Sequence, residues 1–354
     1  MSNRMKAAVL NKPLDIEVKE VPIPEIQADQ VLIKVHCIGI CGSDVHYYEH
    51  GKIGRYEVKE PIILGHEMAG DIVAVGDSVR NLTVGERVAV EPGVTCGRCD
   101  YCKEGRYNLC PDVVFMATPP VDGAWAEYVA VRSDFVFPLP DGMSYETGAL
   151  LEPFSVGMHA MNRGKVKPSD RMLITGLGPI GLLTIQAARL YGVKEIYATD
   201  VVPFRLELAK KLGVAAVIDP SKESLAERLE QLTAGKGMDV SIETSGNPRA
   251  VQDVLTVTRR GGRIVLVGLP AAEEIGIDIT HLVDSEYDVH GLFRYVNTYP
   301  AAIQGLSDQE MNIEQIVTHQ YSLDQIEEAV EKARIEKDTS IKIMIYPDRS
   351  LLNS

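Results

Sequence analysis

The sequence has no surplus of positive charge and no long apolar run. Its 354 residues include 36 Lys and Arg against 50 Asp and Glu, which gives a formal net charge of -14 at pH 7. This balance argues against a nucleic-acid partner, because no basic stripe is available to neutralise phosphates. No segment resembles a membrane span, and the opening MSNRMKAAVLNKP lacks the apolar core of a secretory signal. We therefore expect a cytoplasmic protein that binds neither nucleic acid nor membrane.

Cysteine is also scarce, but its distribution is uneven. The chain has six cysteines, and four of them fall within the single segment CGRCDYCKEGRYNLC. In a reducing compartment such a cluster indicates metal ligands rather than disulfides. Four thiolates that close a tetrahedron leave no position for water or substrate, which is typical of structural zinc. An iron–sulfur cluster also uses four cysteines and is the alternative. The expected ligands are Cys96, Cys99, Cys102 and Cys110.

The two remaining cysteines differ in their surroundings. Cys37 lies inside an apolar, strand-like run and is expected to pack in a core. Cys41 follows that run in GICGSD, where Gly39 and Gly42 open the backbone. The spacing between Cys41 and other residues that can bind metals does not by itself predict that Cys41 is a metal ligand.

The chain has two regions that differ in composition and in the pattern of apolar residues. Up to about Gly148 it is rich in Gly, Pro and Val, with short alternating runs separated by turns, which predicts a small, mostly antiparallel β domain. From about Glu152, apolar strands alternate with helical patterns, which predicts a parallel sheet covered on both faces. Six strands in this order predict an α/β, doubly wound dinucleotide fold. The expected strands begin at Arg171, Glu195, Ala215, Met238, Arg263 and Asp288.

The last segment is expected to rejoin the first domain. Ser322 and Gln325 form a capping-box pattern, so a final helix is predicted to begin at SLDQ. The run SIKIMIY, residues 340–346, then predicts a strand that returns to the β domain.

A glycine motif lies between the first two strands expected in the second region. Gly176, Gly178 and Gly181 give G-x-G-x-x-G after an apolar strand and before a helix, the context that dinucleotide binding requires. The glycines let the backbone approach a pyrophosphate at the helix N-terminus. Asp200 ends the next strand, where it can accept hydrogen bonds from a ribose diol and repel a 2′-phosphate, so NAD is favoured over NADP. Arg205 either packs near the adenosine or is a solvated helix residue.

The segment ILGHEMAG places His66 beside Glu67. Neighbouring side chains of a strand point to opposite faces, so the two can share a ligand only if the backbone turns there. Gly65, directly before His66, makes such a turn cheap.

Several motifs together resemble one family. GICGSDVHYY, LGHEMAG, the four-cysteine segment, YNLCPDVVFMATPPVDGAWAEY, ALLEPFSVGMHA, GLGPIGL and FRYVNTYP are similar to the zinc-dependent medium-chain dehydrogenases, and more narrowly to their polyol branch. The resemblance spans nearly the whole chain. It implies a GroES-like, mostly β catalytic domain (1–154), an NAD-binding Rossmann domain (155–293) and a return segment that completes the catalytic domain (294–354).

The resemblance also implies a catalytic zinc. Its ligands would be Cys41, His66 and Glu67, with Glu152 facing the metal through its water. Alcohol dehydrogenases of the family carry cysteine where this chain has Glu152. One thiolate and one carboxylate neutralise Zn²⁺, and a second carboxylate can accept the hydroxyl hydrogens of a polyol. Whether Glu67 or Glu152 is the third ligand stays open.

Further roles follow from the resemblance alone. Ser43 and His46 are candidates for a proton relay, with Glu152 and water as the alternative route. Ser43 can instead be a helix N-cap, and His46 can be a plain surface residue. The residues implied to orient the substrate are Tyr47, Phe115, Thr118, Glu152, Arg294 and Tyr295, and those implied to contact the cofactor beside the glycine motif and Asp200 are Ile180, Arg205, Val267, Gly268, Leu269, Leu292, Phe293 and Arg294.

The expected protein is therefore an NAD-dependent polyol dehydrogenase with two zinc ions per chain, one catalytic and one structural, assembled as a homotetramer. The closest rival is the same chemistry on another alcohol, such as threonine or butanediol. A non-catalytic structural or binding member of the fold is the other alternative. It is disfavoured because Cys41, His66 and Glu67 are all present.

Overall fold

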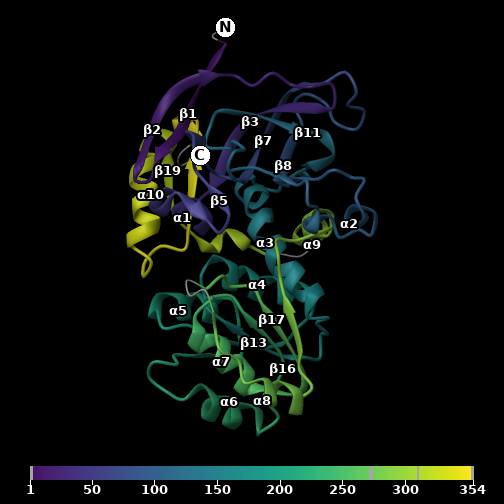
Figure 1. The fold of residues 1–354 in the computed structure, drawn as a ribbon, viewed down its shortest axis with the longest axis vertical. Helices are drawn as coiled ribbons and strands as arrows, with labels where there is room; N and C mark the ends of the chain where they lie inside the picture. Colours follow the sequence, from purple (N-terminus) through teal and green to yellow (C-terminus); the bar gives the residue numbers. More distant parts are fainter. Residues whose placement is uncertain (1–2, 271–273, 309–310, 352–354) are drawn as a thin grey trace. The chain divides into compact units, whose positions relative to one another are not determined.

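The computed structural model describes residues 3–270, 274–308 and 311–351, and the chain divides into two compact units (Figure 1). Unit 1 comprises residues 1–152 and 299–354, and unit 2 comprises residues 153–298. The predicted boundaries, after residues 154 and 293, differ from these because residues 153–154 and 294–298 belong to unit 2.

Unit 1 is built on a seven-stranded sheet in the order β12-β8-β7-β3-β20-β19, with β11 also paired to β3, and on a three-stranded sheet β2-β1-β6. Its strands are β1 (Arg4–Lys12), β2 (Asp15–Pro22), β3 (Gln30–Gly39), β4 (Lys52–Ile53), β5 (Tyr56–Glu57), β6 (Ile62–Ile63), β7 (Glu67–Val75), β8 (Arg87–Val90), β9 (Gly93–Val94), β10 (Val114–Phe115), β11 (Tyr128–Arg132), β12 (Val136–Pro138), β19 (Val317–Ser322) and β20 (Lys342–Tyr346). Its helices are α1 (Gly42–His50), α2 (Asp100–Lys103), α9 (Tyr299–Asp308) and α10 (Ile326–Ile335), with single 3₁₀ turns at η1 (Tyr107–Leu109), η2 (Ser133–Phe135), η3 (Ile313–Ile316), η4 (Leu323–Gln325) and η5 (Arg349–Leu351).

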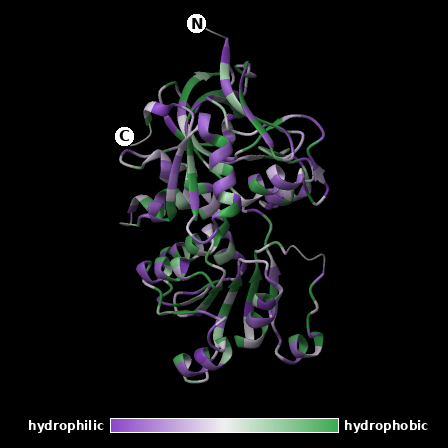
Figure 2. Cartoon of the chain, turned by 90° about the vertical axis from the view of Figure 1, so that its left-hand side faces the viewer, coloured by the Kyte–Doolittle hydropathy of each residue, from purple (hydrophilic) through white to green (hydrophobic). Residues whose placement is uncertain are grey.

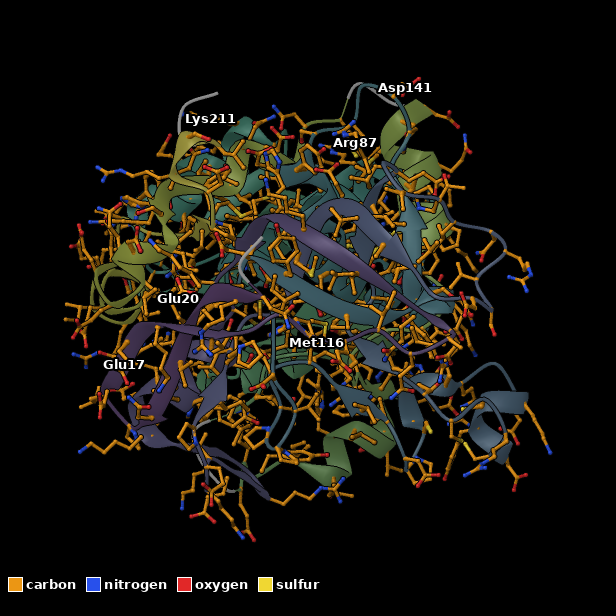
Figure 3. The ribbon with its side chains drawn as sticks, turned by 90° about the horizontal axis from the view of Figure 1, so that it is seen from above. Glu17, Glu20, Arg87, Met116, Asp141 and Lys211 are labelled. Atoms are coloured by element: carbon orange, nitrogen blue, oxygen red, sulfur yellow. The ribbon has the colours of Figure 1, made fainter. Side chains whose placement is uncertain are left out.

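The core of unit 1 lies between its sheets. Apolar side chains alternate along β3, and Trp125, the single tryptophan of the chain, is fully buried. Charged side chains such as Glu17 and Glu20 of β2 are exposed at the outside of the unit (Figure 3). This division of apolar and charged positions is the one expected of antiparallel sheets with a single buried face.

The C-terminal segment completes unit 1, as predicted. β20 pairs antiparallel with β3 and parallel with β19, and α10 packs against α1 and β2 (Figure 1). The capping box is present, since Gln325 accepts hydrogen bonds from the backbone N–H and the hydroxyl of Ser322. The predicted helix start is only partly right, because the box caps the 3₁₀ turn η4 and α10 begins at Ile326.

Unit 2 contains one six-stranded, fully parallel sheet in the order β15-β14-β13-β16-β17-β18, which is the predicted doubly wound order. Its elements are β13 (Arg171–Thr175), α4 (Pro179–Leu190), β14 (Glu195–Thr199), α5 (Pro203–Lys211), β15 (Ala216–Ile218), α6 (Leu225–Thr233), β16 (Met238–Glu243), α7 (Pro248–Val257), β17 (Thr258–Leu266), α8 (Ile279–Asp284) and β18 (Asp288–Gly291). The helix α3 (Tyr145–Arg163) contributes residues to both units.

The strands of unit 2 are apolar along their length because helices cover both faces of the sheet. Nearly every residue of β13, β14 and β16 is buried, and Figure 2 shows these central strands as hydrophobic. Local signals fix where the helices begin. Ser224 caps α6 by accepting a hydrogen bond from Glu227, Asn247 caps α7 in the same way, and Pro179 opens α4. In a parallel sheet all carboxyl ends of strands lie at one edge, so the loops after β13, β16 and β17 are neighbours.

Candidate metal centre and cofactor loops

Cys41, His66 and Glu67 come together in unit 1 although they lie on different segments. Cys41 is the N-cap of α1, His66 lies between β6 and β7, and Glu67 is the first residue of β7. One ligand atom from each lies within 4.8 Å of the others, and His66 and Glu67 are buried. The three residue types are those that zinc prefers.

The turn that this grouping requires is present at Gly65. Its φ of 85° is in the left-handed region, and a Cβ atom there would collide with the ring of Trp125. A second glycine makes room for the carboxylate, because a Cβ on Gly39 would overlap the Oε2 atom of Glu67. Both positions therefore favour glycine on steric grounds.

Asp44 joins the two segments that carry the candidate ligands. It is fully buried on α1, where Oδ2 accepts a hydrogen bond of 2.9 Å from the backbone N–H of Cys41. Its other oxygen, Oδ1, accepts one of 3.0 Å from the N–H of Gly65 and lies 3.7 Å from Nδ1 of His66. Burial lowers the pKa of His66, but the charges of Asp44 and Cys41 outweigh burial, so the pKa is raised well above the usual value.

Lys342 places a buried cation directly on Glu67. Its ammonium group donates hydrogen bonds of 2.7 Å to both carboxylate oxygens and one of 2.9 Å to the carbonyl of Ile40. The side chain of Lys342 is only 2% exposed and that of Glu67 only 1%. Burial lowers the pKa of Lys342, but Glu67, Cys41 and Glu152 outweigh it, so the pKa is raised above 10.5. The ammonium group of Lys342 is therefore held against both carboxylate oxygens of Glu67.

The side-chain atoms of the site are suited to bind a metal ion. The three ligand types supply a sulfur, a nitrogen and an oxygen from one small region. Nδ1 of His66 is buried and has no hydrogen-bond partner among the described residues. This nitrogen faces Oδ1 of Asp44 at 3.7 Å, so the fit to a metal ion is carried by the three ligand atoms that lie within 4.8 Å of one another.

The contacts of Asp44, Gly39 and Lys342 with the candidate ligands were not predicted from the sequence. A signal existed for the lysine, because a charged residue in the apolar run SIKIMIY must find a buried partner. Asp44 lies three residues after Cys41, the spacing at which a helix residue can bond back to its N-cap. The local sequence does not predict the contact between Gly39 and Glu67, because it joins two different strands, β3 and β7.

The other predicted residues of unit 1 have varied surroundings. Glu152 is buried on α3, and its charge affects Lys342. Phe115 packs edge-on against His66 at 5.6 Å between ring centres, and Tyr47 is buried on α1. Thr118 is half-buried in the turn after β10, where its N–H bonds the carbonyl of Phe115.

The two relay candidates both lie on α1. His46 is exposed, and its ring meets that of His50 at 4.9 Å between centres. The alternative role of Ser43 as an N-cap is wrong, because Cys41 occupies that position and Ser43 lies inside the helix.

The four clustered cysteines form a second group in unit 1. One sulfur of each of Cys96, Cys99, Cys102 and Cys110 lies within 4.8 Å of the others. The α2 turn brings the sulfurs of Cys99 and Cys102 to 3.4 Å, and the N–H of Cys99 donates to the sulfur of Cys96. The backbone N–H groups of Arg98 and Cys99 lower the pKa of Cys96 to about 6, which prepares a thiolate for a metal. Cys37, predicted to be a packing residue, is fully buried and outside this group.

The glycine motif of unit 2 forms a tight turn at the end of β13. Gly176 has a φ of 83°, and a Cβ on Gly181 would overlap the carbonyl of Gly176. Gly178 is the N-cap of α4, whose second residue is Ile180. This is the close backbone approach at a helix N-terminus that suits a pyrophosphate.

Asp200 lies beside that turn. Its Oδ2 accepts a hydrogen bond of 2.6 Å from the N–H of Leu177, and its Oδ1 accepts one of 2.9 Å from Val202. The guanidinium of Arg205 is 3.7 Å from Asp200 and its side chain is 19% exposed, so Arg205 is not a solvated helix residue. The residues that directly follow Asp200, Val201 and Val202, are uncharged. The cation beside Asp200 comes instead from Arg205 of α5.

The remaining predicted cofactor residues follow β17 and β18 in unit 2. The N–H groups of Val267 and Gly268 both bond the carbonyl of Glu243. Leu269 and Phe293 are exposed, with the guanidinium of Arg294 over the ring of Phe293. Leu292 bonds the carbonyl of Leu266, whereas Tyr295 is buried.

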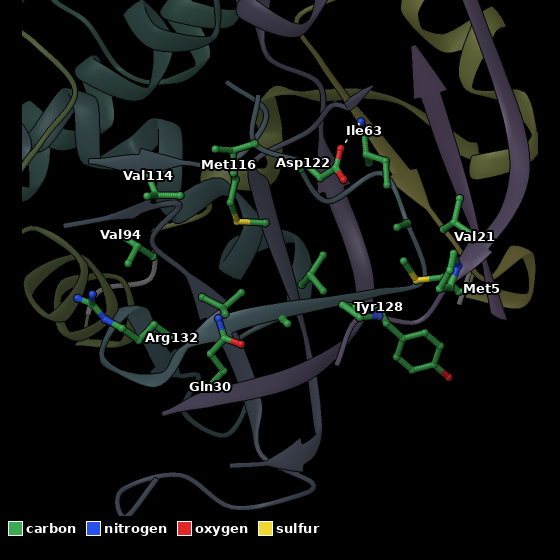
Figure 4. A pocket seen from close by; sticks show the side chains of 18 of the residues that line it. Met5, Val21, Gln30, Ile63, Val94, Val114, Met116, Asp122, Tyr128 and Arg132 are labelled. Carbon is green, nitrogen blue, oxygen red and sulfur yellow. Dashed lines mark hydrogen bonds between the residues drawn. The ribbon is translucent and has the colours of Figure 1, made fainter. Parts of the chain in front are cut away.

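Unit 1 also contains an apolar cavity of about 740 Å³ that the predicted site does not use. Figure 4 shows Met5, Met116 and Tyr128 along its walls, with the hydrogen bond from Ile63 to Asp122 at its rim. Cys41, His66 and Glu67 are not among its lining residues.

Comparisons with known proteins agree with this arrangement. Residues 27–141 match the alcohol dehydrogenase GroES-like domain, and residues 179–308 match the zinc-binding dehydrogenase family. The chain belongs to the zinc-dependent alcohol dehydrogenases. It is 51% identical over 345 residues to the sorbitol dehydrogenase of Bacillus subtilis, covering 98% of both chains.

Two solved structures share the fold. One is 2R,3R-butanediol dehydrogenase from Bacillus subtilis, with a TM-score of 0.89, 33% identity and coverage of 97% and 100% of the two chains. The other is an alcohol dehydrogenase from Escherichia coli CFT073 complexed with NADH, with a TM-score of 0.91, 29% identity and coverage of 98% and 100%. The predicted membership in the polyol branch of the zinc-dependent medium-chain dehydrogenases, and the predicted cofactors zinc and NAD, are confirmed. None of the described helices is both long and apolar enough to span a bilayer.

Proposed function

We propose that the protein oxidises a secondary hydroxyl of a polyol of the sorbitol, iditol or xylitol type to a ketose and transfers the hydride to NAD. The observation that carries this proposal is the group of Cys41, His66 and Glu67 within 4.8 Å in unit 1. The 51% identity to a sorbitol dehydrogenase over nearly the whole chain supports the substrate class.

In this proposal Cys41, His66 and Glu67 hold a catalytic zinc. When bound, zinc supplies Lewis-acid chemistry that lowers the pKa of a substrate hydroxyl. Asp44 positions Cys41 and the turn before His66 through its hydrogen bonds to the backbone N–H groups of Cys41 and Gly65, and Lys342 orients the Glu67 carboxylate through two hydrogen bonds. Phe115 packs against His66 and excludes water from one side of the imidazole.

Glu152 is assigned to the substrate. It is a buried carboxylate, and its oxygens can accept hydrogens from a second hydroxyl, which a polyol has and a monoalcohol lacks. Tyr47, Thr118, Arg294 and Tyr295 are the proposed orienting groups. Ser43 and His46 are the proposed route by which the proton leaves, and the exposure of His46 is suited to exchange with water.

NAD is assigned to the loops of unit 2. The turn at Gly176 offers backbone N–H groups to the pyrophosphate, and Asp200 accepts the ribose hydroxyls. The proposed nicotinamide contacts are the neutral groups Val267, Gly268, Leu269, Leu292 and Phe293, because a flat ring suits a dry slot.

The four-cysteine group is assigned to a structural zinc, since four thiolates leave no open position. Assembly as a homotetramer and a cytoplasmic location belong to this proposal as well. Sedimentation velocity of the purified chain tests the oligomer, and a monomer would contradict it.

The proposed activity is tested by NADH production across a panel of sorbitol, iditol, xylitol and galactitol, with and without a zinc chelator. Activity on polyols that the chelator abolishes is expected. Butanediol and threonine belong in the same panel, because a structural neighbour is a butanediol dehydrogenase. A preference for either would replace the polyol, and NAD binding without any turnover would favour a non-catalytic member.

A further inference from the structure

Glu243 is a buried carboxylate that none of the roles above uses. It is the last residue of β16 and is completely inaccessible to solvent. Among the described residues no Lys, Arg or His forms an ion pair with it, although ionised carboxylates are rarely buried without a cation. Such a group requires an explanation from its hydrogen bonds.

The carboxylate is surrounded by neutral donors from Ser245 and Gly246, two of the three residues that follow it. Oε1 accepts hydrogen bonds from the backbone N–H of Ser245 at 2.7 Å, from the Ser245 hydroxyl and from the N–H of Gly246 at 3.1 Å. Oε2 also accepts from the N–H of Gly246, at 3.1 Å. Glu243 therefore folds the chain at residues 244–246 back onto its own side chain, and we name these residues the β16 corner.

The β16 corner is fixed to the glycine turn on one side. The N–H and the hydroxyl of Thr244 both donate to the carbonyl of Thr175, and the hydroxyl also donates to the carbonyl of Gly176 at 2.7 Å. A Cβ on Gly176 would lie 2.7 Å from the Cβ of Ser245. The corner and the glycine turn are thus in direct contact.

The same corner is fixed to the loop after β17 on the other side. The carbonyl of Glu243 accepts from Val267 at 2.8 Å and from Gly268 at 3.1 Å. A Cβ on Gly268 would overlap the N–H of Gly246 and lie 2.8 Å from Oε2 of Glu243. A Cβ on Gly246 would overlap the carbonyl of Leu269. No side chain separates the corner from this loop.

From these contacts we propose that Glu243 is a positioning residue for NAD, which sets the distance between the glycine turn and the 267–269 loop through the β16 corner. The inference rests on the NAD site assigned to unit 2 under the proposed function. A carboxylate is needed rather than an amide, because every donor around it is an N–H or O–H and an amide group would add two further donors there. Such a residue acts on cofactor affinity and leaves the chemistry at the metal centre unchanged.

The test is Glu243→Gln in the full-length protein, which keeps the volume and removes acceptor capacity. We expect the Kd for NAD, measured by calorimetry without substrate, and the KM for NAD to rise by about tenfold or more, because hydrogen bonds from Ser245 and Gly246 to a buried acceptor are lost. The kcat at saturating NAD and the zinc content should stay within about twofold of the parent. Ser245→Ala, at an exposed residue, removes one donor and should raise the same Kd by a smaller factor.

Asp239→Asn is the matched control, because Asp239 lies on the same strand at its opposite end, where it bonds Arg171 and Arg259. It should lower the Tm without changing the Kd for NAD. If Glu243→Gln lowers the Tm while its Kd stays at the parent value, Glu243 is only a structural residue and the inference is overturned. If Glu243→Gln does not fold, an unchanged Kd in Ser245→Ala overturns it. A parent protein that does not bind NAD at all would instead refute the proposed function.

Discussion

At the scale of single residues, the two carboxylates Glu67 and Glu152 are expected to have roles that zinc content and turnover can separate. Glu67 lies within the three-residue ligand group, whereas Glu152 is not part of it. Glu67→Ala should lose one of two zinc ions per chain together with activity. Glu152→Ala should keep both zinc ions and turn over polyols poorly, by a factor of about 100. Elemental analysis of zinc in the two variants decides, and zinc lost only from Glu152→Ala would reverse the assignment.

Lys342 is expected to matter most when no metal is bound. In the metal-free chain it is the cation that compensates the buried Glu67 carboxylate, and breaking a buried pair by removing one partner costs about 3–5 kcal/mol. Zinc would supply part of the missing charge. Lys342→Met should therefore lower the free energy of unfolding by more in the metal-free form than in the zinc-loaded form, as urea titrations of both forms would measure. Equal losses in the two forms would show that Lys342 does not act through Glu67.

Glu91 makes stability depend on pH. Burial raises its pKa to about 7, with Glu152 adding to the effect and the hydroxyl of Tyr107 opposing it. The folded chain then binds more protons than the unfolded chain between about pH 4.5 and 7, so this group lowers stability as pH rises through that window. Glu91→Gln should gain stability relative to the parent between pH 5 and pH 8, by up to about 3 kcal/mol. Glu20→Gln, on an exposed side chain, is the control and should show no such gain.

At the scale of structural elements, we expect the contact between Arg205 of α5 and Asp200 after β14 to determine which dinucleotide is preferred. Asp200 holds Arg205 at 3.7 Å, so the cation is engaged by a carboxylate that repels a 2′-phosphate. Asp200→Ala removes the repulsion and frees the guanidinium. The kcat/KM for NADP should rise by about tenfold or more, while that for NAD falls.

The matched control for that change is the double variant Asp200→Ala/Arg205→Ala, in which the gain for NADP should disappear. Equal kcat/KM for NAD and NADP in the parent protein would contradict the assignment of Asp200.

We expect the fold of the four-cysteine segment to depend on a bound metal ion. The segment contains only the short turns α2 and η1, and its sulfurs are close to one another without any disulfide. Because metal binding supplies folding energy to such a segment, Cys99→Ser should lose one zinc per chain and lower the Tm by several degrees. Cys37→Ala is the control. It should lower the Tm through a core cavity and keep both zinc ions, and a Cys99→Ser protein with full zinc content would contradict the structural site.

At the scale of the whole molecule, most of the fold was predictable because its signals are local. Continuous apolar strands alternating with helices specify a parallel sheet, and the order of the six strands in unit 2 is that of the predicted doubly wound fold. The short alternating runs expected before Gly148 are also strands, and two of them, β3 and β11, pair antiparallel with each other. The boundary predicted after residue 293 was less accurate, because no change of periodicity marks the passage from residues 294–298 to α9.

The sequence by itself determined those contacts that form between residues of one turn or one motif. Cys96 to Cys110 can reach one ion because they share a single short segment, and the glycine turn fits a pyrophosphate because its three glycines are adjacent to one strand and one helix. Only the tertiary structure decided that Cys41 meets His66, that Lys342 pairs with Glu67, and that Arg205 pairs with Asp200. The spacing of residues along the chain predicts a contact only when the two residues are a few positions apart. Contacts between distant segments depend on strand pairing and on burial, because a buried charge is stable only where the fold brings a partner to it.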